Sequence, residues 1–373
     1  MIYIDPEQAN IIEARTIHYN NIKCYLLKKV GSINKNCKIP NCKICANTLR
    51  GYKKTISKKK GKKTVKTKVT FYFNKIIEDK IKEKGFIDKL LNSDPASLAL
   101  LEKKTIDDLK NTMYSQVLSN NNISPSGICL ATFRIGKLTS IDDINKELEK
   151  LINYETWFKN KEPSYQYSPY HLAKKLDRRT CTYCNRLFTS TITEHGDKKV
   201  SKVTRPQFDH WFPKSKHPLL ALSFYNLIPS CSVCNSNIKG SIDMDLDIHH
   251  HPYYSEFCND FGFSIKHIPK NMIKVITVGG TQKTKDTAKQ LKLEELYSAH
   301  IPEVKDLINL RKSYSDIYIK CLATYLNKIK KLSESEIHRI IFNVESKKED
   351  YHKVPLSKFK NDILKELGVI EIK

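Results

Sequence analysis

The chain has 373 residues, of which 40% are hydrophobic and 28% charged, so it can bury a core and is not a disordered tail. It contains no run of 18 apolar residues, and its first ten residues lack the basic start and apolar run of a signal peptide. These features predict a cytoplasmic protein with no membrane partner. Its eleven cysteines then indicate metal binding, because Cys-x-x-Cys pairs in a reducing compartment favour zinc over disulfides.

The net charge of +25 is concentrated near the start of the chain. Between Ala14 and Ile77 there is no Asp or Glu, while Lys and Arg together number 18. A polyanion is the natural partner of such a segment, because neutralised phosphates release their counterions. An anionic membrane surface, or a solvated basic face that only maintains solubility, would also fit. The absence of acids over 64 residues favours nucleic acid.

The first 170 residues predict a basic N-terminal region, 1–75, and a helical connector, 76–170. Within the first, Thr64–Phe73 alternates in the manner of a strand, and Lys58–Lys63 would form the turn of a basic hairpin. Helices are expected at Lys75–Leu91 and at Pro95–Leu118, where Asp94 is a good N-cap. The connector continues with a loop at Ser124–Gly127 and a helix capped by Thr139 or Ser140, with one apolar face: Ile141, Ile144, Leu148 and Leu151.

Aromatic, Pro, Cys and His residues gather in the region 171–252, and a mostly helical region, 253–373, follows it. A hairpin is expected inside the first of these, with strands Leu187–Thr193 and Val200–Phe208 around a turn at Glu194–Asp197. A short strand, Lys274–Val278, and a long helical stretch, Leu291–Leu332, are expected in the second. Helical spacing in that stretch predicts core positions at Val304, Leu307, Ile308, Tyr314, Ile317, Cys321, Tyr325 and Ile329.

Two Cys-x-x-Cys pairs enclose the centre of the region 171–252: Cys181 with Cys184, and Cys231 with Cys234. Each pair can form a knuckle, and two knuckles complete a tetrahedral four-cysteine site. The Asn that follows each pair, Asn185 or Asn235, tolerates the backbone found after a knuckle. A redox pair or chance would be the alternative. Four thiolates leave no open position for chemistry, so the expected zinc is structural.

Residues suited to phosphodiester hydrolysis lie between these pairs. His210 can take a proton near neutral pH, and Asp209 offers a hard oxygen ligand for Mg²⁺ or Mn²⁺. Asn235 can add a second oxygen ligand, and Asn226 can hydrogen-bond the loop that carries His210. Four basic side chains can contact either phosphate or water: Arg186, Lys214, Lys216 and Lys239. The tract His249–His251 is either a metal ligand set or a loop.

The segment Cys181–Gly240 resembles the HNH nuclease family, which has the ββα-metal fold. Family members with paired zinc knuckles show Cys-x-x-Cys, Asp-His before Pro-x-Ser, Asn-Leu, and then Cys-x-x-Cys followed by Asn or His. The resemblance implies that His210 is the general base, Asp209 the first metal ligand and Asn226 the central Asn. Asn235 stands where the family has a metal-binding His or Asn. This HNN variant favours Mg²⁺ or Mn²⁺ over catalytic zinc.

The sequence outside this segment resembles, more loosely, the HNH subunits of bacterial anti-phage systems of the Septu and retron-associated kind. The phrases Tyr297–His300 and Pro355–Asp362 carry that likeness. This looser resemblance implies a role in antiviral defence. The resemblance to the HNH family implies products with 5′-phosphate and 3′-hydroxyl ends, and double-stranded DNA is the expected substrate.

A second cysteine cluster, Cys37, Cys42 and Cys45, lies in the acid-free segment. Three thiols at this spacing can hold zinc if a fourth ligand arrives, from Cys24, His18 or a distant residue. The alternative is a set of buried, inert cysteines. The surrounding Asn, Pro and Lys are poor core material, which favours metal.

These observations predict an α+β protein in which a ββα-metal, treble-clef-like HNH module with a four-cysteine zinc site is embedded in mostly helical flanks. The expected activity is metal-dependent DNA hydrolysis. One rival is a zinc-containing DNA-binding or adaptor protein with a relic HNH fold. The other is a nuclease subunit that is inactive without a partner ATPase, since the chain has no Gly-x-x-x-x-Gly-Lys-Ser/Thr loop of its own.

Overall fold

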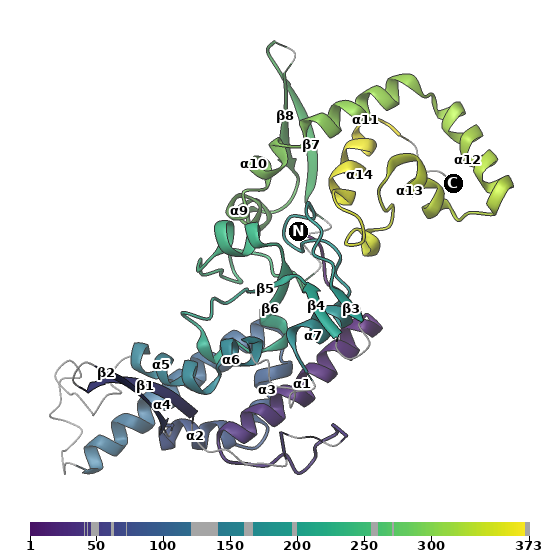
Figure 1. The fold of residues 1–373 in the computed structure, drawn as a ribbon. Helices are drawn as coiled ribbons and strands as arrows, with labels where there is room; N and C mark the ends of the chain where they lie inside the picture. The colour runs from purple at the N-terminus through teal and green to yellow at the C-terminus, as the bar shows by residue number, and fades with distance from the viewer. Residues whose placement is uncertain are drawn as a thin grey trace. The chain divides into compact units, whose positions relative to one another are not determined.

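The computed structural model describes residues 1–40, 42, 44–45, 52–60, 63–71, 73–120, 141–159, 167–195, 200–254, 260–270 and 272–369 (Figure 1). The chain forms two compact units, each assembled from separate stretches. The first unit comprises Met1–Ile11, Ala173–Asp209 and Ile228–Lys373, and the second comprises Ile12–Leu172 and His210–Leu227. The structure mixes helices with small two-stranded sheets, which are β1–β2, β3–β4, β5–β6 and β7–β8. No helix in the described part of the chain is long and apolar enough to cross a bilayer.

The second unit is mostly helical. Its elements are α1 (Ala9–Lys29), β1 (Tyr52–Lys60), β2 (Lys63–Phe71), α2 (Lys75–Lys82), α3 (Phe86–Asn92), α4 (Pro95–Asn120), α5 (Ile141–Leu151), α6 (Tyr154–Lys159), α7 (Pro169–Leu176), η2 (Pro218–Leu220) and η3 (Phe224–Asn226). Its core combines aromatic side chains, such as Trp157 and Trp211, with aliphatic ones, which include Ile22, Leu26, Ile77, Leu90, Leu91, Leu98, Ile144 and Leu148. Burial of these side chains is the main force that holds the short helices together.

The predicted basic hairpin is confirmed as a backbone arrangement. Strands β1 and β2 pair antiparallel from Tyr52 opposite Phe71 to Lys60 opposite Lys63. The predicted turn Lys58–Lys63 is shorter in the structure, because the strands extend to Lys60 and from Lys63 and leave only residues 61–62, which lie outside the described residues, between them.

Helices follow the hairpin as predicted, with one break. The expected helix Lys75–Leu91 divides into α2 and α3, because Gly85 adopts a left-handed backbone with φ of 78°. Asp94 caps α4 as predicted, since its Oδ1 accepts hydrogen bonds from the N–H groups of Ala96 and Ser97 at 3.0 and 3.2 Å. In α5, Ile144, Leu148 and Leu151 are buried, whereas Ile141 is exposed and leaves the predicted face. The loop Ser124–Gly127 and the cap at Thr139 or Ser140 lie outside the described residues.

The first unit combines short strands with a helical C-terminal part. Its elements are β3 (Ile192–His195), β4 (Val200–Thr204), β5 (Gln207–His210), β6 (Leu227–Ser230), η4 (Val233–Lys239), β7 (Gly262–Ile268), β8 (Met272–Val278), α9 (Gln282–Gln290), α10 (Leu293–Ser298), α11 (Ile301–Ser313), α12 (Asp316–Lys330), α13 (Glu334–Phe342), η5 (Lys348–Asp350) and α14 (Ser357–Glu366). The limits of the two units fall inside α1, α7, β5 and β6.

The predicted hairpin between the cysteine pairs has wrong boundaries. Strand β3 begins at Ile192 and runs through His195, so the chain is extended where a turn was expected. The second strand ends at Thr204, and Gln207 starts a new strand that pairs with β6. Pro206 lies at the break, and because proline lacks an N–H it interrupts the ladder. The predicted strand at Lys274–Val278 is confirmed as part of β8, and its partner β7 was not anticipated.

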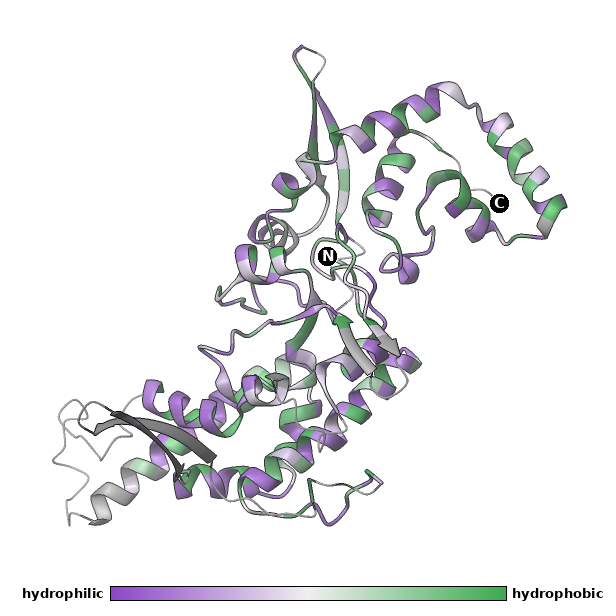
Figure 2. Ribbon diagram, viewed as in Figure 1, coloured by the Kyte–Doolittle hydropathy of each residue, from purple (hydrophilic) through white to green (hydrophobic). Residues whose placement is uncertain are grey.

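The predicted core of the long helical stretch is wrong at its C-terminal half. The stretch divides into α10, α11 and α12, with Pro302 in the first turn of α11 and Ser315 as the N-cap of α12. Val304 and Leu307 of α11 are buried, but Ile317 and Ile329 of α12 are 75% and 65% exposed. Figure 2 shows hydrophobic residues recurring along α12. Periodicity therefore identified an apolar face that the described residues leave exposed.

Candidate functional site

Four cysteines of the first unit form a buried cluster, as predicted. The four Sγ atoms all lie within 4.8 Å of one another, and they belong to Cys181, Cys184, Cys231 and Cys234. With Zn–S bonds of about 2.3 Å, a tetrahedral site places its sulfurs roughly 3.8 Å apart. The four thiols therefore fit one zinc ion without rearrangement of the backbone.

Both knuckles have the local geometry that a thiolate site needs. The N–H of Asn185 donates to the carbonyl of Cys181 at 2.8 Å, and Asn185 has the left-handed φ of 51° expected after a knuckle. In the second knuckle the N–H of Cys234 points to Sγ of Cys231 at 3.4 Å. Backbone N–H groups directed at sulfur stabilise the thiolate form.

The C-terminal part of the first unit holds the first knuckle in place. The Asn185 amide nitrogen donates to the Tyr351 carbonyl at 2.9 Å, and its own carbonyl accepts from the N–H of Leu356 at 2.7 Å. The Tyr297 hydroxyl donates to the carbonyl of Cys184 at 2.5 Å. These supports come from residues more than 110 positions away, so spacing within the motif could not reveal them.

Asp209, the predicted metal ligand, belongs to a buried network in the first unit. Its Oδ2 accepts a hydrogen bond from the Tyr183 hydroxyl at 2.6 Å and lies 3.3 Å from Nζ of Lys239. Burial lowers the pKa of Lys239, and the neighbouring carboxylate opposes that effect. Burial, reinforced by the Asp209 charge, raises the pKa of Tyr183 well above its usual range. Lys239, considered above as a phosphate contact, is instead enclosed against Asp209.

This network does not fit the predicted Mg²⁺ or Mn²⁺ ion at Asp209. The Lys239 ammonium already neutralises the carboxylate, so a divalent cation would have to displace a fully buried positive charge. Asn235, the second predicted oxygen ligand, donates its amide N–H to Oε1 of Gln207 at 2.7 Å. In the described residues, the only groups of three or more His, Cys, Asp or Glu side chains suited to a metal are two cysteine clusters.

His210, the predicted base, belongs to the second unit and has a fixed orientation. Its Nε2 lies 3.0 Å from the carbonyl oxygen of Ala221. A carbonyl only accepts, so Nε2 carries the hydrogen and the neutral imidazole keeps its basic lone pair on Nδ1. The ring of Tyr154 packs edge-on against His210, with centroids 4.3 Å apart.

Asn226 binds the loop after His210, as predicted. Its Oδ1 accepts the N–H of Phe212 at 2.7 Å, and its amide nitrogen donates to the carbonyls of Phe212 and Leu220 at 3.1 and 3.0 Å. The residue is completely buried. Because Leu220 precedes Ala221, this one side chain fixes both the backbone beside His210 and the loop that supplies its hydrogen-bond acceptor. The catalytic roles of His210 and Asn226 stay predictions.

Other candidate side chains have structural partners. Lys214 forms an ion pair with Glu155, and Arg186 donates to Nε2 of His300 at 2.8 Å. In the tract His249–His251, His250 is buried with its Nε2 3.1 Å from the Thr284 hydroxyl. The interpretation of this tract as a packed loop is therefore favoured over a metal site.

The second cysteine cluster acquires the fourth thiol that the sequence left open. Cys24 joins Cys37, Cys42 and Cys45, with one Sγ from each within 4.8 Å of the others. His18, the other nearby candidate, is buried between Tyr167 and the Leu222 carbonyl, at 3.1 and 2.8 Å.

Comparisons with family models, with curated proteins and with solved structures find no match to this chain. The likeness to HNH nucleases accordingly rests on the chain's own residues between Cys181 and Gly240.

Proposed function

We propose that the protein is an HNH-type endonuclease that hydrolyses phosphodiester bonds of DNA, with His210 as the general base. The observation that carries this proposal is the fixed imidazole. The Ala221 carbonyl accepts Nε2–H, and Asn226 hydrogen-bonds the loop on both sides, so the lone pair of the neutral ring is on Nδ1.

The order of elements supports the same function. Strand β5 ends on Asp209 and His210, β6 pairs with it, and η4 follows the second knuckle. This succession is compatible with the ββα order that the resemblance implies, with the π-helix η4 in the place of the α-helix. The excess of basic residues between Ala14 and Ile77 supplies the electrostatic attraction that a DNA substrate requires.

In the proposed mechanism, Nδ1 of His210 removes a proton from a water molecule as its oxygen attacks phosphorus. The resulting imidazolium is stabilised by the Ala221 carbonyl, which accepts the N–H on the opposite side of the ring. The P–O bond to the leaving 3′-oxygen breaks, and that oxygen takes a proton from solvent to give a 3′-hydroxyl and a 5′-phosphate. No step is assigned to a cation at Asp209, because Lys239 neutralises that carboxylate.

The test is cleavage of supercoiled plasmid with Mg²⁺, with Mn²⁺ and with chelator, by wild type and by His210→Ala. The matched control is His267→Ala, which removes an exposed histidine of β7. Cleavage that His210→Ala abolishes and His267→Ala retains supports the proposal. Equal cleavage by all three folded proteins would contradict it.

A second candidate function is a non-catalytic, zinc-stabilised nucleic-acid-binding module. The neutralised Asp209 favours it, because a buried network of Asp209, Lys239 and Tyr183 can serve the fold alone, without a role in catalysis. This candidate predicts that wild type and His210→Ala bind DNA equally in a mobility-shift assay and that neither cleaves it.

A further inference from the structure

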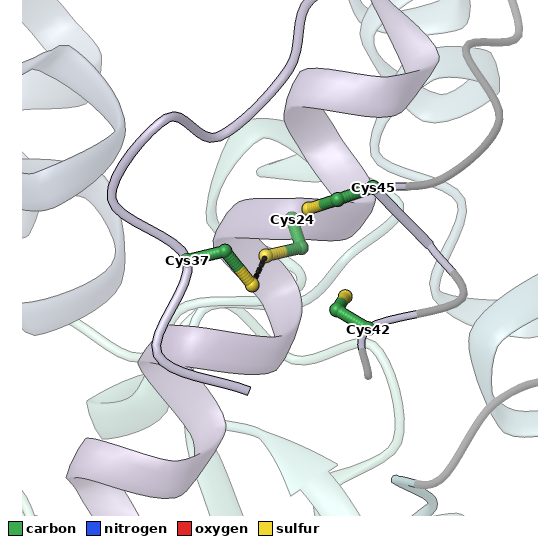
Figure 3. A group of neighbouring side chains, drawn as sticks. All are labelled: Cys24, Cys37, Cys42 and Cys45. Carbon is green, nitrogen blue, oxygen red and sulfur yellow. Dashed lines mark hydrogen bonds between the residues drawn. The ribbon is translucent and has the colours of Figure 1, made fainter. Parts of the chain in front are cut away.

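The second cysteine cluster joins one helix to the segment that leads into the basic hairpin. Figure 3 shows Cys24 on α1 and the other three cysteines on the chain that follows it, with their sulfur atoms turned toward one another. The Sγ atoms of Cys24 and Cys37 lie 3.4 Å apart. A disulfide would place them at about 2.05 Å, whereas two ligands of a tetrahedral zinc ion lie roughly 3.8 Å apart.

We propose that Cys24, Cys37, Cys42 and Cys45 bind a second zinc ion and that this ion fastens the segment Gly31–Cys45, which precedes the β1–β2 hairpin in the chain, to α1. The donor set is that of a closed structural site, with four thiolates around one ion. Soft sulfur ligands in tetrahedral arrangement select zinc over Mg²⁺ or Mn²⁺.

A side chain outside the four ligands supports the assignment. The amide nitrogen of Asn34 donates to Sγ of Cys24 at 3.2 Å, and Asn34 is itself almost fully buried. Its Oδ1 accepts the N–H of Asn36 at 3.2 Å, and its carbonyl accepts the N–H of Cys37. Asn34 thus orients one ligand directly and shapes the turn that delivers the next, as supporting residues around metal sites do.

The surroundings of the cluster explain why a metal is needed there. The segment from Gly31 to Cys45 contains no described helix or strand, and its sequence is rich in Asn and Lys. Such a segment cannot bury enough apolar area to hold itself against α1. Crosslinking it through one ion replaces that missing core, as in other small metal-held folds.

The position of the site gives it a consequence for nucleic-acid binding. Strand β1 begins at Tyr52, seven residues after Cys45, and the paired strands carry eight lysines and no acid. Anchoring the segment that precedes these strands limits the freedom of the basic arm, which lowers the entropy lost when the arm binds a phosphate backbone. This part rests on DNA as the partner, as in the proposed function, but not on catalysis by His210.

Metal analysis of the full-length protein tests the site. Wild type should contain two zinc ions per chain, one for each cysteine cluster. Cys24→Ser and Cys42→Ser should each retain one, as should Cys231→Ser of the other cluster. Cys321→Ser, which changes an exposed cysteine outside both clusters, should retain two. One zinc in wild type with no change in Cys24→Ser, or iron in place of zinc, would overturn the proposal.

A second measurement remains decisive if a serine variant fails to fold. Wild-type protein is reconstituted with Co²⁺, and the absorbance of tetrahedral cobalt thiolate is followed during titration. Saturation at two equivalents supports the site, and saturation at one overturns it. DNA affinity at increasing salt then tests the arm: Cys24→Ser should bind more weakly, while Cys321→Ser, outside both clusters, should bind normally. Unchanged affinity in folded, zinc-depleted Cys24→Ser would overturn the anchoring role.

Discussion

Lys239→Met should destabilise the first unit strongly. Its ammonium lies 3.3 Å from Oδ2 of Asp209, and the two side chains are 0% and 2% exposed. At an effective dielectric constant of about 20, the pair attraction at that distance is about 5 kcal/mol. Removing one partner of a buried ion pair costs about 3–5 kcal/mol, because the other charge stays buried without compensation. Methionine has a similar length and no charge, so the stability lost measures the effect of removing the charge and not that of opening a cavity.

The double variant isolates the interaction. Asp209→Asn with Lys239→Met removes both charges and keeps an acceptor for the Tyr183 hydroxyl, so it should recover at least about 2 kcal/mol relative to the sum of the single changes. Hydrogen exchange by mass spectrometry over residues 200–209 and 228–239, all in the first unit, measures the free energy of opening in each variant. The fluorescence of Trp157 and Trp211, both in the second unit, serves as the internal control. A loss below about 1 kcal/mol in Lys239→Met, or strict additivity, would refute the reasoning.

Two further predictions concern the second unit, and the fluorescence of its tryptophans during denaturant unfolding measures both. Burial lowers the pKa of His18 to about 4, so the unfolded chain binds this proton more tightly. Neutral His18 stabilises the folded state fully above pH 6.5, and about 3 kcal/mol of this stability is lost as the pH falls from 6.5 to 4. His18→Gln should flatten the dependence of the unfolding free energy on pH, whereas His267→Gln should leave it unchanged. Asn226→Ala should lower the free energy of unfolding by about 3 kcal/mol, because it leaves buried backbone groups without hydrogen bonds. A loss of stability no larger than that caused by Asn235→Ala would contradict the bracing role.

The cysteine clusters show how far local spacing predicts a site. Cys181 and Cys184 are three positions apart, so the knuckle is a local structure and the motif specifies it. The fourth ligand of the second cluster could not be chosen in the same way. Cys24 lies on a helix thirteen residues before Cys37, and whether it or His18 turns toward the cluster depends on packing. Only the fold decides between two side chains that the sequence makes equally available.

Lys239 illustrates the opposite failure. A lysine near a knuckle and a catalytic motif is expected on the surface, because burial of an ammonium is rare without a partner. Its partner, Asp209, lies thirty positions earlier, and both are enclosed only after η4 packs in the first unit. The exposed face of α12 has a related cause, since periodicity defines an apolar stripe but not what covers it. The break at Pro206 was missed although the sequence carries its signal, because a proline inside an expected strand removes an N–H from the ladder.

The N-terminal segment can form its native hydrogen bonds only late in protein synthesis. The N–H of Ile2 donates to the carbonyl of Thr182 at 2.7 Å, and that of Ile4 to Pro252 at 2.9 Å, both within the first unit. Their acceptors are translated roughly 180 and 250 residues later, which takes about 10–50 seconds at 5–20 residues per second. Until then these two buried isoleucines lack their native hydrogen-bond acceptors. The residues 1–11 of the first unit are therefore synthesised before the stretch 12–172, and they reach these acceptors only after that stretch has emerged.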